Sequence, residues 1–418
     1  MGEPQLVNTW SISKYAGRVA SGWHHGLPTR EYTADNGIIR SPMLNVVTML
    51  TPNHPGDGCF IVIPGSHKKN FNLNILKFYE FLTSKFTKKI FNLIFNFNGF
   101  EKFLLANSIN LVYFNSMSPT ALVLKKIDFI TSYWDMAHLE YPLFPECKEN
   151  YHSISAREYI YKNLADNSLY VLTDSKEGMK NFSSRYNVNE KKLRIIYSEP
   201  SNQILQKYKT KENLNDEILK KFNLLNKKFI FYPAQYWAHK NHIYILEALK
   251  LMHDKNSGLE ITAVFCGFDK NNLDYLKSIS KKLNIQNNVI FLNFLNEEEL
   301  FTFYKNSFAI VVPTYFGPTN HLPIEGFYFE KPVFYSDIWS ETEQVKGAVI
   351  KIDLNNPNDL ADKLSSLYTN KDLQVEFKQK SKEKYSQLKV KFEDNKKIFV
   401  ELFENYKTLI KTYKINND

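Results

Sequence analysis

Apolar and polar residues follow two repeating patterns over residues 109–414. Short apolar runs bounded by turn residues are typical of buried strands, and apolar residues at three- and four-residue steps are typical of helices. The predicted strands are 109–114, 129–133, 169–173, 193–197, 229–232, 261–266, 289–292 and 308–312, with another after Pro332. The predicted helices are 118–125, 153–166, 176–184, 243–252, 297–305, 356–368 and 371–414, with others starting near 271 and at Pro323. Strands that alternate with helices form parallel sheets, so this pattern predicts an α/β fold.

The first 70 residues have a different pattern. They are rich in Gly, Pro and His, and strand-like runs at 45–50 and 59–63 are separated by turn residues. This spacing predicts antiparallel β-structure. After residue 73, apolar and aromatic residues at helical spacing alternate with lysines. Such a basic amphipathic helix either packs against a sheet or lies on an anionic membrane surface.

Composition and charge limit the possible size, partners and location of the protein. The 418 residues suffice for two or three domains, and 43% hydrophobic and 15% aromatic residues allow sizeable cores. A net charge of +9 suits anionic partners such as nucleoside diphosphates or acidic lipids. Nucleic acid is not favoured, because there is no dense Lys/Arg block and no zinc-finger or basic-helix motif. Three dispersed cysteines, no apolar run of about 18 residues and no signal peptide predict a cytoplasmic protein, or one bound peripherally to the inner face of a membrane.

Two strand ends carry candidate chemistry for binding an anion. After 308–312 come a small-residue loop, Phe-Gly-Pro-Thr-Asn at 316–320, and a helix that contains Glu325. Backbone N–H groups at such a loop and helix start can face a phosphate, although a plain strand-to-helix turn has the same composition. After 229–232, Lys240 and Asn241 precede a helix. An ammonium beside a positive helix end is unfavourable unless an anion binds there, and a solvated surface lysine is the alternative.

A third candidate segment follows the strand at 129–133. The sequence Trp-Asp-Met-Ala-His-Leu-Glu-Tyr-Pro-Leu-Phe-Pro-Glu at 134–146 is dense in titratable and aromatic residues. Ligands of open parallel sheets bind at the carboxyl ends of the strands, which makes Asp135 and His138 candidates. Alternatively, His138 is a core or helix-start histidine bonded locally, and Glu146 caps a loop.

These motifs together resemble the group 1 (family 4) retaining glycosyltransferases, which have the GT-B fold of two Rossmann-like domains. The resemblance rests on 134–146, on Pro-Ala-Gln-Tyr-Trp-Ala-His-Lys-Asn-His at 233–242, and on the loop, Glu325 and Lys-Pro-Val at 331–333. That family usually has two glutamates eight positions apart, and here the first position, 317, is glycine. The resemblance implies sugar transfer from a nucleotide-sugar to a glycan, cell-surface polysaccharide or lipid-linked acceptor, with no metal.

Site residues follow from the same resemblance. Lys240 would neutralise the leaving diphosphate, Glu325 would bind the ribose, and Asp135 and His138 would lie at the interdomain cleft near the reacting sugars. The implied donor-binding residues are Gln235, Lys240, Asn241, Gly267, Gly317, Pro318, Thr319, Asn320 and Glu325.

Residues 52–71 resemble a segment of phytanoyl-CoA dioxygenase-like proteins, which are iron and 2-oxoglutarate enzymes with a double-stranded β-helix. Iron of that type needs two histidines and a carboxylate, but the family's His-x-Asp pair is absent and only His24, His25 and His67 are candidates.

The predicted domains are therefore a β-rich fragment at 1–70, an incomplete acceptor domain at 71–205, a donor domain at 206–395, and a C-terminal helix and tail at 396–418. Two alternatives stay open. One is a catalytically inactive nucleotide-sugar-binding remnant of a fusion, and the other is a dioxygenase acting through residues 1–70.

Overall fold

The computed structural model describes two compact units. The described residues are 33–35, 38–40, 99–107, 109–148, 154–200, 204, 216–255, 258–317 and 321–414. The first unit comprises Met1–Trp134, Ser155–Thr173 and Gly178–Ile195, and the second comprises Asp135–Ile154, Asp174–Glu177 and Ile196–Asp418. The segment that contains Asp135, His138 and Glu146 therefore belongs to the second unit, although its sequence position is in the predicted acceptor domain.

The first unit contains a parallel sheet of four strands in the order β3-β4-β5-β6. The strands are β3 (Leu111–Phe114), β4 (Asp128–Tyr133), β5 (Tyr170–Thr173) and β6 (Leu193–Ile195). Its helices are α3 (Gly99–Ala106), the 3₁₀ helix η2 (Pro119–Val123), α6 (Ile154–Asn167), α7 (Lys176–Tyr186) and the 3₁₀ helix η4 (Glu190–Lys192). The predicted helix at 118–125 is thus only a 3₁₀ turn. Ser118 caps it by accepting a hydrogen bond from the Thr120 N–H, and Pro119 occupies its first position.

The described part of the first 70 residues is one antiparallel pair of strands, β1 (Thr33–Asp35) and β2 (Ile38–Arg40). The predicted strands at 45–50 and 59–63, the dioxygenase-like segment 52–71 and the helix after residue 73 lie outside the described residues, as do His24, His25 and His67.

The second unit is built on a parallel sheet of six strands in the order β12-β11-β10-β7-β8-β9. The strands are β7 (Phe229–Tyr232), β8 (Thr262–Cys266), β9 (Val289–Leu292), β10 (Ala309–Val312), β11 (Val333–Ser336) and β12 (Ile350–Ile352). Every residue of β7, β10 and β11 is buried. Central strands of a parallel sheet are covered on both faces, which explains why they read as continuous apolar runs.

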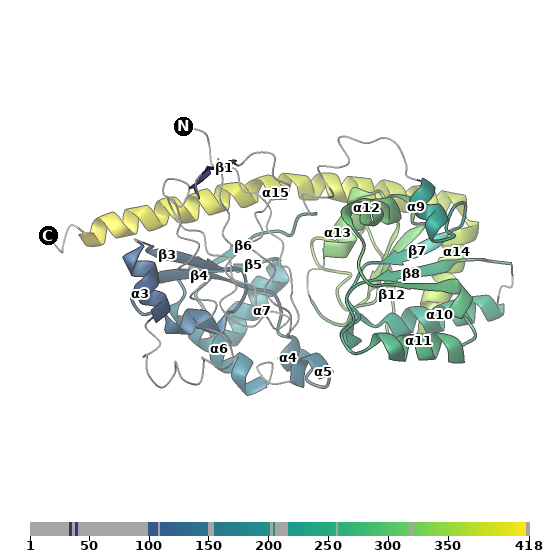
Figure 1. The fold of residues 1–418 in the computed structure, drawn as a ribbon, viewed down its shortest axis with the longest axis horizontal. Helices are drawn as coiled ribbons and strands as arrows, with labels where there is room; N and C mark the ends of the chain where they lie inside the picture. The colour runs from purple at the N-terminus through teal and green to yellow at the C-terminus, as the bar shows by residue number, and fades with distance from the viewer. Residues whose placement is uncertain are drawn as a thin grey trace. The chain divides into compact units, whose positions relative to one another are not determined.

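Helices cover both faces of this sheet. Figure 1 shows α10 and α11 on one side and α12 and α13 on the other. The helices and short 3₁₀ turns of the unit are α4 (Ala137–Glu140), α5 (Pro145–Lys148), α9 (Asp216–Lys221), η5 (Ala238–Lys240), α10 (His242–Lys255), α11 (Leu273–Lys282), η6 (Gln286–Asn288), α12 (Glu297–Asn306), α13 (His321–Tyr328), α14 (Pro357–Thr369) and α15 (Lys371–Lys414).

The strand order reverses direction between β7 and β10. β7 leads through α10 to β8 on one side, whereas its other neighbour, β10, leads through α13 to β11 on the opposite side. The loops after β7 and β10 therefore leave adjacent strand ends and enter helices on opposite faces. Such a topological switch point is where open α/β sheets bind ligands.

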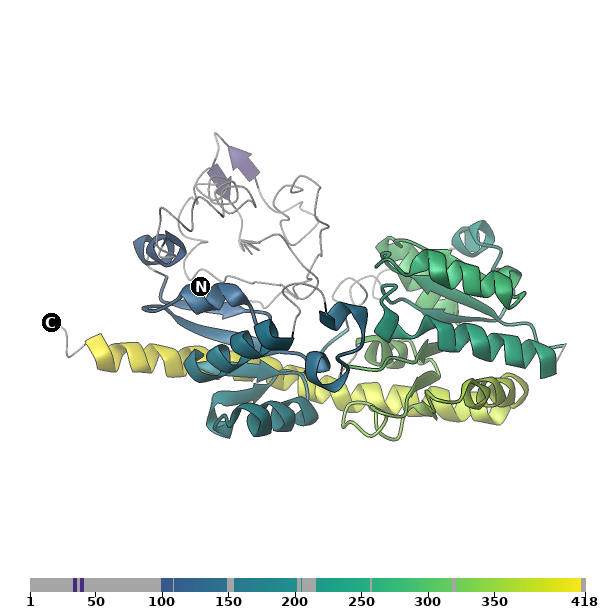
Figure 2. The same ribbon diagram turned by 90° about the horizontal axis from the view of Figure 1, so that it is seen from below.

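The last helix, α15, is 44 residues long and runs without a break across the predicted boundary at 395/396 (Figure 2). Its buried Asn395 accepts a hydrogen bond from the Tyr197 N–H at 2.9 Å and donates to the Tyr197 carbonyl at 2.9 Å. It also donates to Glu199 Oε1 at 3.1 Å. This side chain therefore fixes the chain segment that enters the second unit.

Candidate functional site

The loops after β7 and β10 meet at His239. The N–H of Tyr315 donates to the His239 carbonyl at 3.0 Å, and Thr314 Oγ1 approaches the same oxygen at 3.5 Å. The ring of Phe316 stacks on the imidazole, with 3.8 Å between centroids and 20° between planes. These contacts join the two loops of the switch point.

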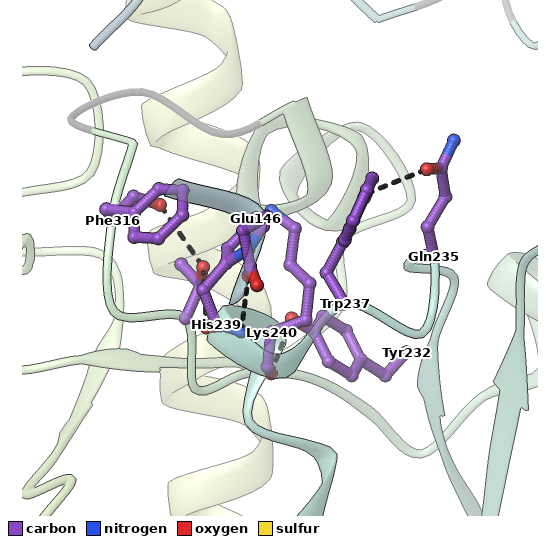
Figure 3. A network of polar contacts seen from close by, with 8 residues as sticks. Glu146, Tyr232, Gln235, Trp237, His239, Lys240 and Phe316 are labelled. Atoms are coloured by element: carbon purple, nitrogen blue, oxygen red, sulfur yellow. Dashed lines mark hydrogen bonds and ion pairs between the residues drawn. The ribbon is translucent and has the colours of Figure 1, made fainter. Parts of the chain in front are cut away.

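A third segment reaches the same histidine. Glu146, on the one-turn helix α5, accepts a hydrogen bond from the His239 N–H at 2.9 Å and contacts the ring Nδ1 (Figure 3). Both side chains are only 10% exposed. Around them lies a small apolar cluster, which consists of Ala137, Tyr141, Phe144, Cys147, Tyr315 and Phe316. Segment 135–148 is thus packed onto the switch point of the second unit.

The charge states of this pair follow from burial and hydrogen bonding. Burial raises the pKa of Glu146, but the hydrogen bonds and charge of His239 outweigh it and hold that pKa below its usual value. Burial lowers the pKa of His239 to about 4, against the opposing effect of Glu146. At neutral pH the pair is therefore a carboxylate and a neutral imidazole. Because the Glu146 carboxylate can only accept a hydrogen bond, Nδ1 of His239 must carry the imidazole proton.

Lys240 follows His239 at the end of η5, ahead of α10. Its carbonyl accepts a hydrogen bond from the Tyr232 hydroxyl at 3.0 Å (Figure 3). Burial lowers the pKa of the Lys240 ammonium to about 8, while Asp135 and Glu146 act in the opposite direction. The lysine predicted at this helix start is thus a half-buried cation near two carboxylates, not a solvated surface lysine.

Asn241 turns the chain into α10. Its backbone is left-handed, with φ 55° and ψ 42°, a conformation that asparagine adopts more readily than most residues. The side-chain Nδ2 is buried and has no hydrogen-bond partner among the described residues. A buried amide donor without an acceptor is uncommon, and a ligand would satisfy it.

Asp135 and His138 lie on the same segment as Glu146. Asp135 Oδ1 accepts a hydrogen bond from the Ala137 N–H at 2.9 Å and so starts α4. Its charge also acts on His239 and Lys240, which places Asp135 near both. His138 is fully buried.

Glu325 lies buried on α13 and accepts a hydrogen bond from the hydroxyl of Tyr304 on α12. Tyr304 is itself fully buried, and burial together with the Glu325 charge raises its pKa well above the usual value. The next residue, Gly326, allows α13 to lie close to the sheet, since a Cβ there would be 2.7 Å from Val333 Cγ2. The carboxylate is therefore fixed by a hydrogen bond from the neighbouring helix α12.

Two of the predicted glycines have backbone roles. A Cβ at Gly267 would lie 2.4 Å from the Ala234 carbonyl oxygen, because the end of β8 crosses the loop after β7 at very short range. Gly317 has φ 97°, which favours glycine.

Gln235 Oε1 accepts a hydrogen bond from Trp237 Nε1 at 2.9 Å (Figure 3).

The remaining predicted loop residues, Pro318, Thr319 and Asn320, lie outside the described residues. Among those that the structure describes, no group of three or more His, Cys, Asp or Glu side chains is placed to hold a metal ion. No helix in the described ranges is long and apolar enough to cross a membrane.

Comparison with known proteins agrees with this architecture. Residues 215–384 match the family model of the glycosyl transferases group 1. Among proteins with curated annotation, none matches the sequence. Sucrose-phosphate synthase from Thermosynechococcus elongatus has a similar structure, with a TM-score of 0.60 at 14% identity over 74% of this chain and 77% of that chain. A glycosyltransferase from Rickettsia africae is similar with a TM-score of 0.58 at 18% identity, over 77% of this chain and 83% of that chain. HepE from Anabaena, whose structure was determined with UDP-glucose, is similar with a TM-score of 0.58 at 13% identity, over 72% of this chain and 81% of that chain.

The predicted GT-B fold is therefore confirmed, as is the enzyme class, a glycosyltransferase, since residues 215–384 match the glycosyl transferases group 1. The family 4 assignment, the dioxygenase-like fragment and the incomplete acceptor domain stay predictions. Lys240 and Glu325 fall inside the matched range, whereas segment 135–148 falls outside it. Sequence reasoning missed the roles of His239, Glu146 and Tyr304 in holding the site together.

Proposed function

We propose that this protein transfers a sugar from a nucleotide-sugar donor to a glycan, polysaccharide or lipid-linked acceptor, with retention of anomeric configuration. The observation that carries the proposal is the pair of donors at the switch point. Lys240 is a half-buried cation, and the neighbouring Asn241 has a buried amide donor without an acceptor among the described residues. Both precede the 14-residue helix α10, whose positive end adds to the attraction for an anion.

A nucleoside diphosphate satisfies these groups. Its phosphates would neutralise Lys240 and accept from Asn241, and the backbone at Gly317 would supply further N–H groups. Glu325, fixed by Tyr304, would accept hydrogen bonds from the ribose. Asp135, near Lys240, would face the sugar. Stabilising the charge of the departing diphosphate, together with positioning the sugar, is the main contribution to catalysis that these residues offer.

Calorimetric titration of the full chain with UDP, GDP and dTDP tests the proposal. UDP is the first probe, because a structure with a similar fold was determined with UDP-glucose. Lys240→Ala removes a charge-assisted contact and should weaken binding by at least about tenfold. Glu325→Ala should weaken UDP but leave inorganic pyrophosphate unchanged, since its partner is the ribose.

Lys250→Ala is the matched control. This lysine lies later on α10 and pairs with Asp254 one turn on. The substitution removes the same charge, so UDP affinity should stay within about twofold of wild type if position rather than net charge decides binding. A folded wild-type chain that binds none of the three nucleotides would overturn the proposal. Hydrolysis of UDP-glucose to UDP then distinguishes an active enzyme from one that only binds the donor.

A further inference from the structure

Residues far apart in the sequence hold three polar groups of His239: the backbone N–H, the ring Nδ1 and the carbonyl. Its N–H and ring Nδ1 contact Glu146, 93 positions earlier, and its carbonyl accepts from Tyr315. One face of its ring lies on Phe316. His239 makes these contacts within η5, a single turn of a connecting loop, where the backbone is usually freer.

The position of His239 determines the backbone position of Lys240. The two residues share η5, a single 3₁₀ turn in which the Lys240 N–H donates to the Trp237 carbonyl at 3.2 Å. The Asn241 N–H donates to the Ala238 carbonyl at 3.0 Å. Because the three residues share one hydrogen-bonded turn, a shift of the His239 backbone would also move the Cα atoms from which the Lys240 and Asn241 side chains extend.

We propose that Glu146 is a positioning residue of the donor site, which anchors His239 and thereby holds Lys240 and the 314–317 loop in the geometry that binds a nucleoside diphosphate. The inference rests on the proposed function and adds a residue outside the matched family range. It also gives segment 135–148 a role: the donor site is complete only when this segment is packed on the second unit.

Electrostatics make the proposal sharply testable. Glu146 is a carboxylate near the place where a diphosphate would bind, so its charge alone repels the ligand. If Glu146 had no positioning role, replacing it by glutamine would remove this repulsion and tighten the binding of the diphosphate. A positioning role predicts the reverse, because the glutamine amide cannot match a carboxylate as an acceptor for two N–H groups.

The experiment is UDP titration at pH 7 with wild type, Glu146→Gln and Glu140→Gln. We expect Glu146→Gln to weaken UDP binding about tenfold, the loss of one charge-assisted hydrogen bond. Glu140→Gln removes a carboxylate from the same segment, on the exposed side of α4, and should leave the affinity equal or slightly higher. Thermal unfolding of each variant identifies loss of folding.

A second pair of variants tests the contact from the other side. His239→Asn keeps a side-chain N–H near the position of Nδ1, whereas His239→Ala removes it. His239→Asn should therefore retain several times more UDP affinity than His239→Ala. The titratable groups near Lys240 are Asp135 and Glu146, which favour its charge, and three histidines whose pKa values its charge lowers, His239, His242 and His321. Glu146→Gln should accordingly move the alkaline loss of UDP binding to lower pH, which a change in stability alone would not do.

The outcomes separate this inference from the proposed function. If folded wild type binds no nucleotide, the proposed function fails. If wild type binds UDP but Glu146→Gln binds it equally or more tightly, the positioning role alone is refuted. If both His239 variants lose affinity to the same extent, the hydrogen bond to Glu146 is not what positions the loop, and the inference is likewise refuted.

Discussion

Replacing Lys240 by methionine should make the ligand-free protein more stable. The pKa of Lys240 falls from the usual 10.5 to about 8 in the folded protein, because burial penalises the ammonium more than Asp135 and Glu146 favour it. A drop of that size corresponds to about 3 kcal/mol at 1.36 kcal/mol per pH unit. Because the side chain keeps some contact with solvent, we expect Lys240→Met to raise the free energy of unfolding by about 1–3 kcal/mol at pH 7.

The pH dependence gives the sign of this effect. Below about pH 8, Lys240 is protonated in both folded and unfolded chains, and the folded state bears the whole penalty. Between pH 8 and 10.5 the folded protein releases the proton while the unfolded chain keeps it, so wild type becomes more stable relative to the variant. The advantage of Lys240→Met should therefore be largest at pH 7 and shrink towards pH 10.5.

Urea unfolding of both proteins at pH 7, 9 and 10 measures this difference. Lys250→Met is the control, because that lysine is paired with Asp254 and its loss should change stability by less than about 0.5 kcal/mol. Adding UDP at 100 times its Kd should stabilise wild type by about 2.7 kcal/mol and the variant by much less. A variant less stable than wild type at pH 7, or an advantage that does not fall with rising pH, would refute the reasoning.

Three further predictions follow from the same contacts. UDP affinity of wild type should fall about tenfold between pH 7 and pH 9, since a lysine with a pKa of about 8 is then about one-eleventh charged; Lys240→Arg should remove this loss in calorimetric titrations. Gly267→Ala should lower the unfolding free energy by about 3 kcal/mol or more, because the new Cβ would meet a backbone carbonyl at 2.4 Å, whereas Gly258→Ala, with no atom within 4 Å, should be neutral in thermal unfolding. Tyr304→Phe removes the hydrogen bond to the buried Glu325 and should cost about 1–3 kcal/mol of stability and weaken UDP binding without affecting pyrophosphate.

Local signals in the sequence were enough for most of the second unit. The runs at 229–232 and 289–292 match β7 and β9 residue for residue, because each is an apolar stretch bounded by polar or turn residues. Lys240 could be found because a cation at a helix start is unfavourable without an anion. The prediction of a helix at 118–125 is wrong, because Pro119 after a capping serine allows a short 3₁₀ turn as readily as an α-helix.

Contacts between distant segments could not be predicted in this way. Glu146 and His239 are 93 positions apart, and Tyr304 and Glu325 are 21 apart on different helices. Sequence shows which residue types are present and their local pattern, whereas these pairs depend on how α5 and α12 pack in the folded protein. Glu146 was therefore read only as a loop cap. The better signal was the histidine beside Lys240, whose ring needs a hydrogen-bond partner wherever it is buried.

Lys240 and Asn241 each carry a side-chain group that makes the ligand-free fold less stable. The ammonium is half-buried at the positive end of α10, and the buried amide of Asn241 has no acceptor among the described residues. A sequence selected only for folding would have replaced them, since each has a cheaper alternative such as methionine or glycine. One diphosphate would relieve the charge and the amide together. A buried cation beside an unsatisfied buried amide, at the point where the strand order reverses, therefore supports a donor site better than either feature alone.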